Sequence, residues 1–139
     1  MSFLLDTSVL IDVARRHPAV TRWWTAQDAR LLFTSTITVG ELYRGAYFRH
    51  ARDPQRLLRA VGEIAEVALA PLRGRVLAFD EPAAEIWGRL MGEGEATGQR
   101  PTLDDAKIAA IALLHGLTVA TSNQRDLAPL CPTIDPRAP

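Results

Sequence analysis

The chain has 139 residues, of which 47% are hydrophobic and 23% are charged, and its formal net charge at pH 7 is zero. This length and composition predict one globular domain over residues 1–139, with no room for a second core. The balanced charge excludes a protein that attracts polyanions through its overall field, so any nucleic-acid surface has to be a local patch.

Cys131 is the only cysteine, so no internal disulfide can form and a reducing compartment is expected. No stretch approaches the roughly 20 apolar residues that a membrane span requires. The first residues lack the basic start of a signal peptide and carry Asp6 inside their apolar run. We therefore expect a cytoplasmic protein, in which only the Pro-containing segment 132–139 is expected to be loose.

Short apolar runs alternate with helical patterns along the chain. Buried strands are predicted at residues 3–5, 31–33, 76–79 and 117–121, with a short fifth strand at 133–135. Capping residues, prolines and apolar periodicity predict helices after residues 6–8, from Pro18, at 37–50, from Pro54 towards Leu69, from Pro82, and from Pro101 to His115. Strands that are apolar on both faces predict an α/β fold with a mostly parallel sheet of four to five strands between helices. Ligand sites of such folds lie at the carboxyl ends of the strands.

Two acidic residues are expected near that edge of the sheet. Asp6 directly follows the first predicted strand, although Asp is also a common N-cap residue. Glu41 shares a helical stripe with Ile37 and small residues, where a carboxylate is poorly hydrated unless it is paired. Its structural alternative is an ion pair with Arg44 at i+3 or with a distant arginine. Each alternative is open when one residue is considered alone.

Asp104 and Asp105 stand in the first turn of the last long predicted helix. With Thr102 as the cap, Asp105 fits a capping box, and both acids would favour the positive end of the helix dipole. Asp105 shares a stripe with Ile108 and is expected to face inward. Asp104 points about 100° away from it, and we expect a solvated ion pair between Asp104 and Lys107.

Asp6, Glu41 and Asp105 together predict a metal site. Three ionised carboxylates about 5 Å apart would repel by roughly 3 kcal/mol per pair at an effective dielectric constant of about 20. The sum, about 10 kcal/mol, is comparable to the stability of a whole domain, so either some are protonated or a cation lies among them. Oxygen ligands without His or Cys select Mg²⁺ or Mn²⁺, which neutralise phosphate and lower the pKa of a bound water.

Other phosphate-handling α/β classes fit the sequence less well. A phospho-acceptor receiver domain requires a lysine after its fifth strand, but Lys107 lies in a predicted helix. A haloacid-type phosphatase requires a second aspartate where Ser8 stands. No Gly-rich loop ending in Gly-Lys-Ser/Thr is present, so nucleotide hydrolysis is unsupported.

The segments LLDTSVL, ITVGELYRG and DDAKIAAIALLHGLTVATSNQRDL, with the ending TIDP, resemble the PIN-domain ribonucleases. The resemblance is closest to the bacterial toxins of the VapC/FitB type, covers nearly the whole chain and keeps the order and spacing of the motifs. It implies a three-layer α/β/α sandwich and a metal-dependent endoribonuclease that acts as the toxin of a toxin–antitoxin pair. A non-catalytic PIN-like module that binds RNA or protein is the alternative, and the presence of all three acids disfavours it.

Carried over by position, the resemblance implies that Asp6, Glu41 and Asp105 are catalytic. Asp6 and Asp105 would be the ligands of Mg²⁺ or Mn²⁺. Glu41 would complete the site or orient the attacking water.

The family's fourth position departs from its usual pattern. Ser122 and Asn123 stand where the family often shows Arg followed by Asp or Asn. Asn123 or Asp126 is therefore expected to support the site, with Thr7 and Thr121 beside the acids. We expect one well-bound ion, and a second ion only with the substrate phosphate as a ligand.

Two further sets of residues suggest partners. A basic run is either a solvated helix face or an RNA-binding track, and it comprises Arg44, Arg49, Arg52, Arg56 and Arg59. An aromatic set is either core or part of a groove for the antitoxin, and it comprises Trp23, Trp24, Tyr43, Tyr47 and Phe48. The resemblance also implies a homodimer that contacts DNA only through its antitoxin and does not bind membranes.

Overall fold

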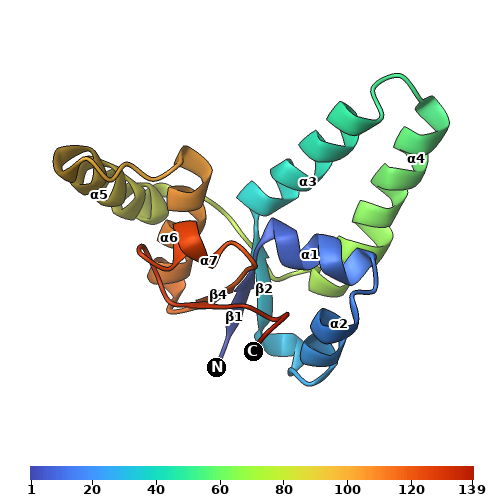
Figure 1. Cartoon of the computed structure of the whole chain (residues 1–139), viewed down its shortest axis with the longest axis horizontal. Coiled ribbons are helices and arrows are strands. Elements are labelled where there is room, and N and C mark those ends of the chain that lie inside the picture. The colour runs from blue at the N-terminus through green and yellow to red at the C-terminus, as the bar shows by residue number, and fades with distance from the viewer.

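The computed structural model describes residues 1–139 and contains one five-stranded sheet in the order β3-β2-β1-β4-β5, in which every neighbouring pair is parallel. The strands are β1 (Phe3–Leu5), β2 (Leu32–Ser35), β3 (Val76–Leu77), β4 (Thr118–Ala120) and β5 (Thr133–Ile134). The α-helices are α1 (Thr7–Ala14), α2 (Pro18–Thr25), α3 (Thr36–Arg49), α4 (Pro54–Glu63), α5 (Glu81–Thr97), α6 (Leu103–His115) and α7 (Gln124–Leu127). Helices α1 to α4 lie on one side of the sheet and α5 to α7 on the other (Figure 1). The predicted three-layer α/β/α sandwich is confirmed.

Because β1 lies at the centre of the sheet and is covered on both faces, each of its residues is apolar. Phe3 and Leu5 pack into the core beneath α1, α2 and α3, whereas Leu4 packs into the core beneath α6. Successive side chains of a strand point to opposite faces, so a strand covered on both sides has no position left for a polar residue.

Local capping signals determine where the helices begin and end. The Ser35 hydroxyl accepts a hydrogen bond from the Thr38 N–H (3.1 Å), and the Asp80 carboxylate accepts one from the Ala83 N–H (3.1 Å). Gly116 ends α6 with a left-handed backbone (φ 65°), which glycine adopts without strain. These boundaries agree with the sequence to within a residue or two.

The helix predicted from Pro54 towards Leu69 is not one regular helix. Its α-helical part ends at Glu63, and the chain continues as the π-helix η2 (Ile64–Leu69) and the short 3-10 helix η3 (Ala70–Leu72). The wider turn keeps Ile64 and Ala68 buried in the core that contains α1.

No helix of the chain combines the length and the hydropathy needed to cross a membrane.

The segment predicted to be loose is held against the domain over most of its length. The Val119 N–H donates to the Pro132 carbonyl (2.9 Å), and β5 pairs with β4. Beyond β5, the Arg137 guanidinium forms an ion pair with Asp12 on α1 (2.7 Å). Composition suggested mobility here, but a ladder contact and a charged contact with distant residues fix this segment.

Candidate active site

The carboxyl ends of β1 and β4 bring Asp6 and Thr121 into contact. The Asp6 N–H donates to the Ala120 carbonyl (3.0 Å), which continues the pairing of β1 with β4 by one residue. The Thr121 hydroxyl donates to the Asp6 carboxylate (2.8 Å), and both side chains are buried. Asp6 therefore lies at the edge of the sheet where the fold predicts a ligand site.

Asp6 occupies the N-cap position of α1, yet its side chain makes no capping hydrogen bond. Asp6 is thus the N-cap residue by backbone conformation, as the structural alternative holds, but its carboxylate accepts from Thr121 and does not cap the helix. Burial raises the pKa of Asp6 above its usual value, and the negative charge of Asp105 raises it further, while the bonds from Thr121 and from the Thr7 backbone lower it. Ionisation of Asp6 is therefore less favourable than that of an exposed aspartate.

Glu41 reaches the same region from α3. Its half-buried carboxylate accepts a hydrogen bond from the Thr7 hydroxyl and forms no ion pair with Arg44 or any other basic residue. Burial raises the pKa of Glu41, and the charges of Asp6 and Asp104 add to the shift, whereas the bond from Thr7 opposes it. Glu41 is therefore in the electrostatic field of two other acids.

The first turn of α6 differs from the prediction in two respects. The Thr102 hydroxyl accepts from the Asp105 N–H (3.2 Å), but the reciprocal bond of a capping box is absent, so the Asp105 carboxylate is free. The ion pair predicted between Asp104 and Lys107 is also absent, and the Lys107 ammonium lies over the Phe79 ring, 5.6 Å from its centre. Asp104 instead lies close enough to Glu41 to raise its pKa.

Asp6 is thus in the electrostatic field of Asp105, and Glu41 is in that of Asp6 and Asp104. None of these four carboxylates forms an ion pair. No three of the chain's acidic, histidine or cysteine side chains are placed to hold a metal ion as they stand. Mg²⁺ commonly binds proteins through one or two carboxylates and completes its shell with water. The donor set suits such an ion, and its assignment as ligands stays a prediction.

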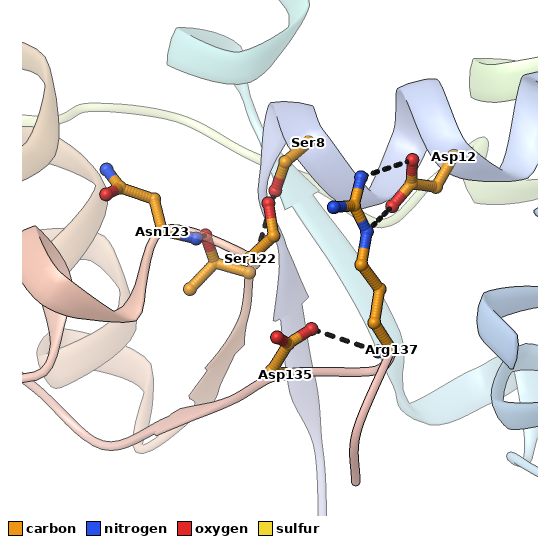
Figure 2. Close-up of polar contacts among 7 residues, drawn as sticks. Ser8, Asp12, Ser122, Asn123, Asp135 and Arg137 are labelled. Carbon is orange, nitrogen blue, oxygen red and sulfur yellow. Dashed lines mark hydrogen bonds and ion pairs between the residues drawn. The ribbon is translucent and has the colours of Figure 1, made fainter.

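The segment after β4 packs against the start of α1. The Ser122 N–H donates to the Ser8 hydroxyl (3.1 Å), and the Asn123 N–H donates to the Thr121 hydroxyl (2.9 Å). Figure 2 shows these contacts beside α1. The Asn123 side-chain amide bonds to no other protein group, and Asp126 is exposed on α7, a helix that the sequence did not predict. Their supporting roles stay predictions.

The basic run extends from α3 through the loop that follows it into α4, which carries Arg56 and Arg59. Arg44, Arg49 and Arg52 are exposed, and the Arg49 guanidinium lies over Gly45. Helices α3 and α4 form a helical hairpin, and the loop between them is the part that projects farthest from the sheet (Figure 1). RNA binding by these arginines stays a prediction.

The aromatic set is divided between the core and the surface. Trp23 is buried and packs edge-to-face against Phe3, with ring centres 5.0 Å apart. Trp24 and Tyr43 pack partly buried against the same core. Tyr47 and Phe48 are 57% and 85% exposed near the end of α3. Three of the five aromatic residues therefore belong to the core or its border, and only Tyr47 and Phe48 are available to a partner.

An ion pair between a buried aspartate on α1 and a half-exposed arginine near the end of the chain was not predicted from the sequence. Asp12 on α1 is only 5% exposed, and the Arg137 guanidinium donates two hydrogen bonds to it (2.7 and 2.9 Å). Asp135 accepts from the Arg137 backbone N–H (2.9 Å), as Figure 2 shows. No local pattern could have predicted a contact between residues 125 positions apart.

Cys131 takes no part in the candidate chemistry. Its side chain is buried, and burial raises the pKa of the thiol to about 12. The thiol therefore stays protonated at neutral pH and is a poor nucleophile.

The fold and the site together define a three-layer α/β protein with a parallel sheet and a group of carboxylates at the carboxyl ends of its strands. The chain belongs to the PIN domain family, whose model matches residues 3–129. This finding confirms the resemblance that the sequence motifs carry.

Individual relatives agree with this placement. The chain is 36% identical over 130 residues to VapC ribonuclease Y4jK of Sinorhizobium fredii, covering 91% of this chain and 88% of the relative. It is 35% identical over 121 residues to toxin FitB of Neisseria gonorrhoeae, covering 85% of each. The crystal structure of FitAcB from Neisseria gonorrhoeae gives a TM-score of 0.82 at 28% identity, with 96% of this chain and 97% of that chain covered.

Proposed function

We propose that this protein is a Mg²⁺- or Mn²⁺-dependent endoribonuclease and the toxin of a toxin–antitoxin pair. The observation that carries the proposal is the group of four carboxylates without a counter-cation at the carboxyl edge of a PIN-domain sheet. A related ribonuclease and a related toxin, both covered over most of their lengths, support the same activity and role.

In this proposal Asp6 and Asp105 hold the ion, directly or through water. The ion supplies charge neutralisation at the phosphate and a lowered pKa for water. Thr121 orients Asp6, and Thr7 orients Glu41, which positions the attacking water. Attack by water, as the family resemblance implies, leaves a 5′-phosphate and a 3′-hydroxyl.

The proposed partner is an antitoxin that covers the toxin. A cavity of about 190 Å³ lies between α1, α3, α4 and η2; aliphatic residues make up most of its lining, together with Arg15, Arg49, His50 and Glu63. Tyr47 and Phe48 are exposed near the end of α3. Such surfaces suit the apolar side chains of a protein partner. We further propose a cytoplasmic homodimer that contacts DNA only through the antitoxin.

Cleavage of RNA by purified Asp6→Asn and Asp105→Asn variants tests the enzyme assignment. We expect activity with Mg²⁺ or Mn²⁺ to fall by more than about 100-fold, because even outer-shell changes at metal sites cost about 10–100-fold. Asp28→Asn is the control, because Asp28 lies in an exposed ion pair with Arg30. Undiminished cleavage by the site variants would remove the assignment.

Calorimetric titration with Mg²⁺ or Mn²⁺ distinguishes the enzyme from a non-catalytic PIN-like module. The enzyme binds the ion through the two aspartates, and the module shows no heat of binding. Co-expression with the neighbouring small open reading frame, followed by affinity purification, tests the partner. Failure of that gene product to co-purify and to inhibit cleavage would contradict the toxin assignment.

A further inference from the structure

A second, larger cleft adjoins the candidate site. Its volume is about 900 Å³, and it lies between the end of α5, the loop that leads to α6, and α7. Asp105, one of the two proposed metal ligands, lines this cleft together with Thr97, Gln99 and Thr102. The cleft therefore extends away from the point at which the proposed reaction takes place.

The wall formed by the end of α5 is a fixed part of the fold. Gly98 ends α5 with a left-handed backbone (φ 74°), and the Gln99 N–H donates to the Gly94 carbonyl (2.8 Å). A Cβ atom on Gly94 would lie 2.7 Å from the Pro101 ring and 2.9 Å from the Gln99 carbonyl oxygen. The glycine allows the loop to pack directly on the helix, so backbone contacts hold this wall of the cleft in place.

The lining of the cleft is polar and contains two arginines. Arg100 is paired with Glu95 at 3.7 Å, but both side chains are more than half exposed, and such pairs contribute little. Arg125 on α7 is exposed and has no carboxylate partner at all. The cleft therefore presents one unpaired guanidinium and one that can exchange its partner.

The two hollows of the molecule suit different occupants. The smaller one, between α1 and α3, is lined mainly by aliphatic residues and fits apolar side chains. The larger one offers hydroxyl groups, an amide, two guanidinium groups and the carboxylates of Glu93, Asp105 and Asp126, and its hydrophobic residues are Leu90 and Leu130. Arginine, threonine and glutamine side chains are the groups that bind phosphate and sugar in nucleic-acid complexes.

We propose that this cleft binds the RNA strand next to the scissile phosphate, with Arg125 contacting a backbone phosphate and Arg100 exchanging Glu95 for a second one. The inference rests on the proposed function, because Asp105 links the cleft to the reaction. Glu93 and Asp126 also line the cleft, and their negative charges disfavour a phosphate beside them, so we place the strand on the Arg125 side of α7. The basic run on α3 is not required for this contact.

The test is the salt dependence of RNA binding by Arg125→Gln and Arg125→Lys. Binding of a fluorescent single-stranded RNA is measured with Ca²⁺ in place of Mg²⁺, and a gel checks that the RNA stays intact. Loss of one phosphate contact should lower the magnitude of the slope of log K against log salt by about 0.7. Arg125→Lys keeps the charge and should keep the slope. Arg73→Gln is the matched control, because Arg73 is exposed, lies outside the cleft and should leave the slope unchanged.

A wild-type slope in Arg125→Gln would overturn the inference, and so would a protein that does not bind RNA. Weaker antitoxin binding with unchanged RNA binding would assign the cleft to the antitoxin and overturn it as well. Thermal melting checks that each variant is folded, and Arg100→Gln provides a second neutralisation on another element. Arg125-dependent RNA binding without cleavage in Mg²⁺ would contradict the nuclease and leave the cleft assignment standing. Cleavage of RNA by the wild type together with an unchanged slope in Arg125→Gln would support the nuclease and contradict the cleft assignment.

Discussion

Asp6 combines burial, a hydrogen bond from Thr121 and the nearby charge of Asp105. Burial, the largest cause, raises the pKa of Asp6 above its usual value of 3.8. A carboxyl group whose pKa is higher in the folded than in the unfolded state contributes stability below the unfolded pKa. That contribution is lost as the pH rises through the folded pKa. At neutral pH, Asp6 therefore lowers the free energy of unfolding of the metal-free protein.

Asp6→Asn should be more stable than the wild type at pH 7 in EDTA, because the amide cannot ionise. The difference in melting temperature should shrink as the pH falls towards about 4. Asp28→Asn should behave in the opposite way, because Arg30 lowers the pKa of Asp28 to about 2 and its stabilising effect is lost only in acid. A pH-independent difference between Asp6→Asn and the wild type would contradict this account.

Thr121→Val removes the hydroxyl that holds Asp6 and keeps the shape of the side chain. We expect a loss of about 1.5–3 kcal/mol, as for hydrogen bonds to charged groups, and about 10–100-fold weaker metal binding. Thr34→Val is the matched control, since Thr34 is equally buried but donates to the Leu5 carbonyl (2.9 Å). Calorimetry should show weakened metal binding in the first variant and unchanged binding in the second.

At the scale of elements, the first turn of α6 assigns helix capping and the proposed metal binding to two different residues. Thr102 caps the helix, while the Asp105 carboxylate makes no capping bond. Thr102→Ala should cost about 1 kcal/mol of stability, whereas Asp105→Asn should abolish cleavage with little loss of stability. Asp80→Ala, a cap loss at α5, should match Thr102→Ala in urea denaturation. Equal destabilisation by Asp105→Asn would favour the capping role.

The elements that the sequence predicted well are those with local signals. The helix α6 has a capping threonine before it and Gly116 after it, and both act as expected. The helix α7 was missed because four residues are too few to show a periodicity. The proximity of Asp104 to Glu41 depends on how α3 and α6 lie relative to each other, which propensity and spacing do not encode. The elements that carry the acids were predictable from the sequence, whereas the residues that surround each acid were not.

At the scale of the whole molecule, the chain end is tied to the helix that begins at the site. Arg137→Ala leaves Asp12 buried without its counter-charge. Breaking a fully buried pair costs about 3–5 kcal/mol, and we expect about 2 kcal/mol here because the Arg137 side chain is 46% exposed. Arg30→Ala, which breaks an exposed pair, should cost less than about 1 kcal/mol.

Urea denaturation measures both losses from Arg137→Ala and Arg30→Ala. The double variant Asp12→Asn/Arg137→Ala should recover part of the loss, because it no longer buries an unpaired charge. Equal losses from Arg137→Ala and Arg30→Ala would show that the contact with Asp12 does not hold the chain end.

Divalent ions should stabilise the folded protein as a whole, because they bind carboxylates that only folding brings together. Binding adds stability by mass action, about 2.7 kcal/mol at a free ion concentration of about 100 times Kd. The stabilisation by Mg²⁺ should grow as the pH rises, because the raised pKa values of Asp6 and Glu41 make protons compete with the ion. Asp6→Asn/Asp105→Asn should melt at the same temperature with Mg²⁺ and with EDTA. A Mg²⁺ effect of equal size in this double variant would place the ion elsewhere and separate the acids from metal binding.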